Sequence, residues 1–477
     1  MTRQHNFVNR FAIRYTGRGP VDRREGFTLT ELLVTCALVT VLMLACAQIF
    51  SIASKTIGGG QAINAAVRDA QAAQAVFARD FSAAAPATVS PVMYIVSDRQ
   101  YAFRNSNDSL SDTDGNIASA DFDGDGNEET LSQAIYNFRN HRIDTVGFFA
   151  IDKYARQTGN GNALIIADAS REAWIWYGHL TLANNDTSPT YYGPGDNHVS
   201  ATNRNDNNRF ATQWILGRVT VLMKDPSTIN GGSAVAIPYG NGDLRPLAFR
   251  TTSSQPNDAL LNFEYDMAAV TLAQFKQDVL NASSPLSHMI FEDAGSTRVG
   301  RIRANPFQVR PLDAQKVAQQ VPIFVPACTQ FIVEFAGDFL EQNPSTGAVE
   351  DVNSNGTVFE SDGQIDYVPG TGQVRWYGMP RDTNGNGIIS ASDGDVVPVR
   401  DVAGGTAPVF ERVLPTTSAL SNYSNSGVTL SRYIAAWGPT DLNRPKMIRI
   451  TLVIDRPEAE GRLLEGQSFE YVFNVGY

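Results

Sequence analysis

Cysteine is scarce in this chain, with three residues in 477. Cys36 and Cys46 lie in one apolar run, which leaves Cys328 alone in the rest of the chain. No disulfide can therefore form within the large C-terminal part. An oxidising compartment is not excluded, since a chain of this length can bury enough apolar surface to be stable without disulfides.

Histidine is also rare, and none of the five is paired with another at metal-ligand spacing. The sequence contains no H-E-x-x-H, C-x-x-C, P-loop or G-x-S-x-G motif, which are the signatures of common hydrolases and oxidoreductases. We therefore expect that the protein is not an enzyme. His179 is typical of a core or turn histidine, and Trp174 and Trp176 are typical of a strand packed on a core.

Positive charge is concentrated at the N-terminus. The net charge is −11, and the first 26 residues carry +4, which leaves −15 for the remainder. An acidic remainder disfavours nucleic acid as a partner, because phosphates need a basic face, and it favours divalent cations. The N-terminal cluster has six arginines against two acids: Arg3, Arg10, Arg14, Arg18, Arg23 and Arg24 against Asp22 and Glu25.

One long apolar run follows these arginines, from Gly26 to Ser54, and Glu31 is its only ionisable acid or base. About 24 helical residues span roughly 36 Å, enough for a ~30 Å hydrocarbon layer. The arginines favour a cytoplasmic N-terminus and export of the C-terminal bulk. Two alternatives are a plain signal anchor and a lipoprotein acylated at Cys46, but the run lacks a signal-peptidase site.

The segment GFTLTELLV, residues 26–34, closely resembles the processing site of type IV prepilins. The resemblance implies cleavage after Gly26 by a prepilin peptidase and methylation of the new N-terminus, Phe27. It also implies an assembly role for Phe27 and Glu31, since the Glu31 carboxylate of one subunit can neutralise the amine of its neighbour within an apolar filament.

The helix is expected to continue to Pro86, with Gly58–Gly60 predicting a bend or local melting. Residues 74–81 are similar to the end of this helix in J-type minor pseudopilins of type II secretion and W-type minor pilins. We expect a leader at 1–26, a pilin helix at 27–86 with 27–50 transmembrane, and a periplasmic or extracellular head at 87–477.

Beyond Pro86, Gly, Pro, Asn and Asp divide short apolar segments, which predicts a β-rich head. The expected fold class is α+β: a long N-terminal helix packed on an antiparallel, pilin-like sheet, with large insertions at 184–208, 234–310 and in acidic loops. A helix is expected at Leu272–Leu280, with a capping box of Thr271 and Gln274. Strands are expected at 163–167, 172–177, 331–335, 373–377, 447–454 and 469–473, the last two as an antiparallel pair.

Two acidic loops match the twelve-residue calcium loop of the EF-hand and dockerin type, with oxygen ligands at positions 1, 3, 5, 7 and 12 and glycine at 6. Asparagine at positions 3 and 5 and aspartate at 12 lower the ligand charge, which predicts weak affinity, on the order of 10⁻⁴ to 10⁻³ M. The candidate ligands are Asp382, Asn384, Asn386, Ile388 and Asp393 in one loop and Asp351, Asn353, Asn355, Thr357 and Asp362 in the other.

Two further loops are less complete, and turn formation alone also explains clusters of Asp, Asn and Gly. One has Asp121, Asp123, Asp125 and Asn127, with Glu128 or Glu129 in place of the closing acid. The other has Asp112, Asp114 and Asn116, with Asp121 or Asp123 available to close it. We expect structural Ca²⁺ that orders long loops.

These features predict a minor pilin or minor pseudopilin that initiates or caps a type IV pilus or a type II secretion pseudopilus. Its expected location is the bacterial inner membrane before assembly and the filament tip afterwards, where a bulky head fits best. Its expected partners are other pilins, the prepilin peptidase and the membrane. The alternative is an adhesin-like or substrate-recognising pilin whose head binds a surface, a glycan or a secreted protein.

Overall fold

In the computed structural model the chain forms two compact units, residues 1–57 and 58–477. The described residues are 28–97, 99–103, 119–120, 129–130, 138–160, 163–180, 182–183, 191–192, 194, 210–225, 267–268, 271–281, 323–356, 358, 360–379, 396–397, 433–441, 443–456 and 466–475. Most of the expected insertions, and residues 1–27, lie outside these ranges.

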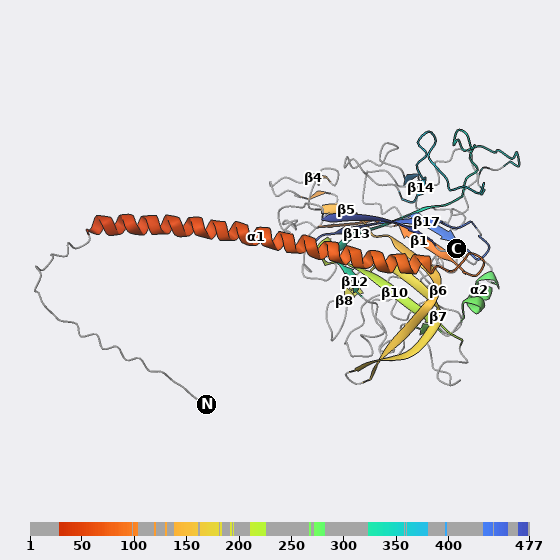
Figure 1. Cartoon of the computed structure of the whole chain (residues 1–477), viewed down its shortest axis with the longest axis horizontal. Coiled ribbons are helices and arrows are strands. Elements are labelled where there is room, and N and C mark those ends of the chain that lie inside the picture. The colour runs from red at the N-terminus through yellow and green to blue at the C-terminus, as the bar shows by residue number, and fades with distance from the viewer. Residues whose placement is uncertain are drawn as a thin grey trace, which may run out of the picture. The chain divides into compact units, whose positions relative to one another are not determined.

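One helix, α1, runs from Leu29 to Ser82 and is drawn in red and orange in Figure 1. It ends four residues before Pro86, at a turn at Ala83, and Ala84 then forms an isolated bridge with Ala150 of β6. The helix is unbroken through Gly58–Gly60, so local melting there is not found. The boundary between the two compact units nevertheless falls at Gly58.

The larger sheet of the head, in the part of the chain that is described, has seven strands in the order β11-β10-β7-β6-β1-β16, with β12 also pairing with β10. Its pairs are antiparallel except β10–β11. The strands are β1 (Met93–Ser97), β6 (Thr145–Asn160), β7 (Ala163–His179), β10 (Ile215–Met223), β11 (Met267–Ala268), β12 (Ile323–Pro326) and β16 (Tyr433–Trp437).

The second sheet has five described strands in the order β15-β14-β13-β17-β18. The expected antiparallel pair closes one end, since β17 and β18 pair in register from Met447↔Asn474 to Ile454↔Gln467. The strands are β13 (Cys328–Ala336), β14 (Trp376–Tyr377), β15 (Val396–Val397), β17 (Met447–Ile454) and β18 (Gln467–Asn474).

Smaller elements complete the described head. They are the pairs β2 (Arg99–Phe103) with β5 (Phe138–Arg142), β3 (Ser119–Ala120) with β4 (Glu129–Thr130), and β8 (Leu182–Ala183) with β9 (Tyr191–Tyr192), the 3-10 turn η1 (Ala211–Gln213), and α2 (Leu272–Asn281). The capping box of α2 is confirmed: Thr271 N donates to Gln274 Oε1 at 3.0 Å, and Gln274 N donates to Thr271 Oγ1 at 3.2 Å.

The two sheets are joined by a buried ion pair. Arg142 donates to both carboxylate oxygens of Asp144, at 2.9 and 2.6 Å, and Nη1 of Arg142 donates to the Met379 carbonyl. Asp144 Oδ2 also accepts from Val333 N of β13 at 2.8 Å and from Ser97 Oγ of β1 at 3.1 Å. One charged pair therefore connects β1 and β5 to β13 and the chain after β14.

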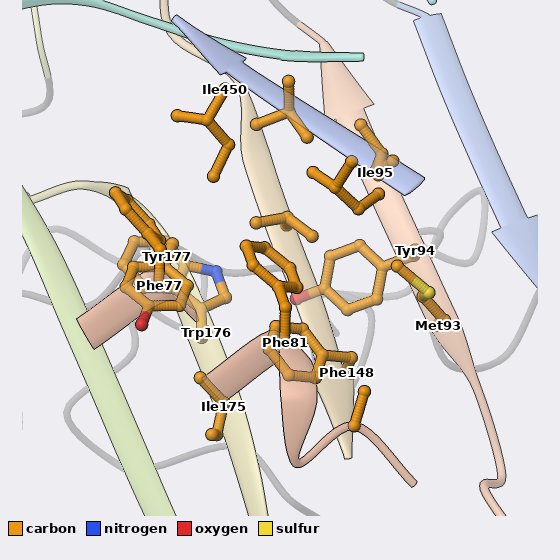
Figure 2. Packing of buried hydrophobic residues seen from close by; sticks show 14 of the residues in the cluster. Phe77, Phe81, Met93, Tyr94, Ile95, Phe148, Ile175, Trp176, Tyr177 and Ile450 are labelled. Carbon is orange, nitrogen blue, oxygen red and sulfur yellow. The ribbon is translucent and has the colours of Figure 1, made fainter. Parts of the chain in front are cut away.

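The C-terminal half of α1 packs where the sheets meet, and Figure 2 shows Phe77 and Phe81 pointing into this core. The Phe77 ring lies 4.6 Å from Tyr177 of β7 and 5.2 Å from Phe324 of β12. It also contacts the second sheet, at 6.2 Å from Phe331 and 5.9 Å from Phe473. The antiparallel sheets and the long helix agree with the expected α+β fold.

Candidate functional site

The N-terminal site begins with a helix cap. Gly26 and Phe27 lie outside the described residues, and α1 starts at Leu29. Glu31 Oε2 accepts from Thr28 N and Thr28 Oγ1, both at 2.9 Å, while Glu31 N donates to Thr28 Oγ1 at 3.3 Å. This is a reciprocal capping box, so Glu31 satisfies the backbone at the start of its own helix.

The first part of α1 has an apolar surface with nothing packed on it in the described chain. The helix is long and apolar enough to cross a membrane, by its length and composition. Its large exposed side chains are Leu29, Leu32, Leu33, Val34, Leu38, Val39, Val41, Leu42, Met43, Leu44, Ile49, Phe50, Ile52 and Ile57. These side chains lie on all faces of the helix, as expected for a segment surrounded by lipid or by other apolar helices.

The second part of α1 has one buried stripe, which repeats every three or four residues and fixes the helix on the head. Small alanines allow a close approach of the strands, and the phenylalanines fill the wider end. The stripe consists of Ala62, Ala66, Ala70, Ala73, Phe77 and Phe81. Asp69 adds an ion pair with Arg456, directly after β17.

A buried polar cluster holds the end of α1. Asp80 is fully buried, and its Oδ2 accepts from Tyr177 Oη at 2.5 Å and from Arg218 Nε at 2.6 Å. Arg79 donates to Asp80 Oδ1 from the exposed side. Burial, followed by the nearby Asp80 charge, raises the pKa of Tyr177 well above its usual value, so Tyr177 remains a proton donor.

The 337–379 segment is a region with little regular structure, and buried acids bind its backbone. Asp338 accepts from Asp362 N and Gly363 N, both at 3.0 Å. Asp366 accepts from Leu340 N at 3.1 Å and from Tyr377 Oη at 2.6 Å. Burial raises the pKa of Asp366 to about 7, although its hydrogen bonds act in the opposite direction.

The expected calcium loop at 351–362 lies in this segment. Asp351 accepts from Asn355 N at 3.0 Å and Gly356 N at 2.7 Å, and Gly356 has φ +89°. Asn355 Nδ2 donates to both oxygens of Glu360, at 2.8 and 2.9 Å, and Asn353 Nδ2 donates to Glu360 Oε1. The loop therefore folds back on itself, and Glu360 faces the side chains at positions 3 and 5.

Asp362, the acid expected to close the calcium loop, accepts hydrogen bonds from backbone amides instead. Its oxygens accept from Gln342 N at 3.1 Å and Gln364 N at 2.8 Å. Sequence spacing did not single out Glu360, which stands two residues earlier. Thr357 is outside the described residues.

The other expected calcium ligands cannot be placed. Asp382–Asp393, Asp112–Asn116 and Asp121–Asn127 lie outside the described residues, and only the backbone of Glu129, in β4, is described. Within the described ranges, no group of three or more His, Cys, Asp or Glu side chains is arranged to hold a metal.

The tryptophans and the histidine of β7 lie in the core. Trp174 and Trp176 are fully buried, so they pack in the core as predicted. His179 is also buried, with Nε2 2.8 Å from the Cys328 carbonyl, and burial lowers its pKa to about 4. The sequence indicates Asp80 only as part of residues 74–81 at the end of the helix, and no sequence pattern indicates Arg218 as its partner.

A sequence profile described as the prokaryotic N-terminal methylation motif matches residues 22–47. No curated protein matches the chain, and no solved structure matches it. The motif covers Gly26, Phe27 and Glu31, and it indicates a type IV pilin-like protein. Proteins with this motif generally interact with other pilins and with a prepilin peptidase, and the N-terminal apolar helix fits single-pass membrane anchoring.

Proposed function

We propose that this protein is a minor pilin or minor pseudopilin that joins a filament through α1 and initiates or caps it. The observation that carries the proposal is the methylation motif at the start of a helix whose first part is apolar on every face. Such a surface is stable only in lipid or against other apolar helices. The large head supports a tip position on steric grounds.

Glu31 has a defined part in this proposal. Cleavage after Gly26 would place the amine of Phe27 within one helical turn of Glu31. In a filament, the Glu31 carboxylate would exchange its bonds to Thr28 for the amine of a neighbouring subunit. A buried carboxylate in an apolar environment needs such a partner.

The test combines processing with assembly. Mass spectrometry of the protein from its native membrane should find N-methyl-Phe27 as the first residue, and tagged protein should co-purify with other pilin-like subunits. Glu31→Gln keeps the shape of the side chain and removes its charge, so it should reduce co-purification with other subunits. The head should still fold in this variant, because Glu31 lies outside it. An intact leader, an acylated Cys46, or capture of only surface ligands would contradict the proposal.

We also propose that the acidic loops bind structural calcium. The Asp351 loop supports this with its twelve-residue spacing, its positive-φ Gly356 and the approach of Glu360 to Asn353 and Asn355. At about 10 mM Ca²⁺, a site with the expected weak affinity stabilises the folded state by roughly 1.4 to 2.7 kcal/mol.

Calorimetry and thermal unfolding test the calcium proposal. Chelation should lower the unfolding temperature, and Asp351→Ala combined with Asp382→Ala should remove most of that difference. Glu360→Gln and Asp362→Asn then form a matched pair, because only the acid that closes the loop should weaken binding. An unfolding temperature that calcium does not change would exclude a structural role.

A further inference from the structure

Among the described strands, none pairs with the outer edge of β18. Within the described second sheet, β18 is the terminal strand and pairs with β17 on one side only. The eight β17–β18 pairs run from Gln467 to Asn474 without a register shift. The edge is therefore regular and long enough to template another strand.

The direction of the backbone groups follows from the ladder. Val475 N donates to Lys446 O at 2.9 Å, toward β17. In an antiparallel ladder alternate residues face the same neighbour, so the N–H groups of Ser468, Val472 and Asn474 point away from β17. In the described chain these three amides donate to no acceptor, and Val472 is 52% exposed.

The edge also lacks the features that usually prevent strand pairing. Its sequence, QSFEYVFN, contains no proline and no lysine, Glu470 is its only charged residue, and no bulge interrupts it. Natural edge strands are usually protected by such devices or are very short. At the other end of the same sheet β15 has only two residues.

The position of β18 in the head indicates which partner would supply a strand to its outer edge. Phe473 of β18 packs on α1, with ring centroids 5.9 Å from Phe77 and 5.6 Å from Phe81. The inner face of β18 therefore lies against the end of α1 within the head, and the methylation motif implies interaction with other pilins. Under the proposed filament function, the neighbours of this head are the heads of other pilin-like subunits, and these supply the strand.

We propose that the outer edge of β18 receives an extended strand from the head of a neighbouring pilin-like subunit, which adds a strand to the β14-β13-β17-β18 sheet. This inference rests on the proposed filament function. The main-chain groups of Ser468, Val472 and Asn474 supply the hydrogen bonds. The incoming strand should alternate apolar and polar residues, because β18 turns Phe469, Tyr471 and Phe473 toward the core and its alternate side chains, from Ser468 to Asn474, toward solvent.

The test replaces one outward amide in the full-length protein in its native membrane. Val472→Pro removes the outward N–H without removing a bond to β17, and proline is tolerated on edge strands. Val472→Ala is the matched control, because it shortens the side chain and keeps the N–H. Ser468→Pro removes a second outward amide and serves as the alternative should Val472→Pro unfold the head, which thermal unfolding will report.

A photo-cross-linking residue is placed at the exposed position 474. The measured quantity is the yield of its cross-link, and mass spectrometry identifies the linked peptide. We expect a cross-link to a head strand of another pilin-like subunit in the wild type and in Val472→Ala, and a decrease of at least tenfold in Val472→Pro. An unchanged cross-link in a folded proline variant would overturn the inference. A cross-link only to a second copy of this chain, or only to a protein without the methylation motif, would also overturn it.

Failure of the inference can be distinguished from failure of the proposed function. If wild-type protein co-purifies with pilin-like subunits but position 474 gives no cross-link to them, only the β18 inference is wrong. If no pilin-like subunit co-purifies with any variant and Phe27 is not methylated, the filament function itself is wrong.

Discussion

At the residue scale, the buried acids differ in how their charge is balanced. Asp80, Asp144 and Glu334 each form an ion pair with an arginine, at 2.6 Å in every case. Asp366 instead accepts hydrogen bonds from backbone amides and from Tyr377. Because those partners carry no charge, desolvation dominates at Asp366 and favours its protonated form.

Asp366 should make stability depend on pH. Its pKa is about 7 in the folded protein, against an ordinary value of 3.8. Between about pH 4 and 7 the folded state holds a proton that the unfolded state has released, so the free energy of unfolding falls as pH rises, by up to about 4 kcal/mol. Urea unfolding at pH 5 and pH 8 should show this loss.

Asp366→Asn is the control for that prediction, since it resembles the protonated acid at every pH. The difference in stability should favour Asp366→Asn at both pH values, and it should be about 2–3 kcal/mol larger at pH 8 than at pH 5. His179 contributes in the opposite direction, because its lowered pKa causes stability to be lost as pH falls from about 6.5 to 4. A difference that does not change between pH 5 and 8 would show that Asp366 does not titrate in this range.

Asp80→Asn should destabilise the head by about 3–5 kcal/mol, because it leaves the guanidinium of Arg218 largely buried without its counter-charge. Arg79→Gln is the matched control: Arg79 bonds the same carboxylate, but its side chain is 56% exposed. Its loss should cost less than about 1 kcal/mol. Chemical unfolding of both variants measures the two effects, and equal losses would contradict the assignment of Arg218 as the main partner.

At the element scale, local patterns predicted some elements and missed the extent of others. The capping box of α2 and the whole of β17 follow from residues within one segment. By contrast, the predicted strands 163–167 and 172–177 are one strand, β7, because β6 continues to pair with it through two register shifts. The predicted strand 373–377 contains only Trp376–Tyr377 as β14, with an isolated bridge between Tyr367 and Val374.

The glycines in α1 give a prediction at this scale. A Cβ added to Gly59 or Gly60 meets nothing within 4 Å, so each alanine should stabilise the helix by about 0.5–1 kcal/mol. Amide hydrogen exchange around residues 57–63 should slow in Gly59→Ala and Gly60→Ala.

Gly147→Ala is the contrasting variant. Its Cβ would lie 2.4 Å from the buried ring of Tyr94, so it should lower stability by about 1–3 kcal/mol. Unchanged exchange around residues 57–63 in both α1 variants would show that these glycines do not limit the helix.

At the scale of the whole molecule, the sequence predicted the N-terminal helix but not the order of the strands. The helix follows from a continuous apolar run and an adjacent motif. Strand order depends on pairs far apart in the chain, such as β1 with β16, and short apolar segments do not encode their partners. The calcium prediction rests on spacing, and spacing alone does not show that Glu360 contacts Asn353 and Asn355.

The described core lies entirely in the second compact unit, from Ala66 onward. A chain lacking residues 1–57 should therefore keep the unfolding temperature of the full-length head and should no longer require detergent. Thermal unfolding and membrane fractionation measure both properties. A large loss of stability on removing residues 1–57 would show that the apolar segment contributes to the fold of the head.

The aromatic cluster around Phe77 also constrains how the head folds during synthesis. Phe77 contacts Phe324, Phe331 and Phe473, so its core closes only when nearly the whole chain is available. At ribosomal rates of about 5–20 residues per second, the interval between Phe77 and Phe473 is on the order of tens of seconds. During that time the buried face of α1 has no complete partner. The core around Phe77 is therefore completed only after the C-terminal strand has been made, and contacts this far apart in the chain favour slow folding of the head.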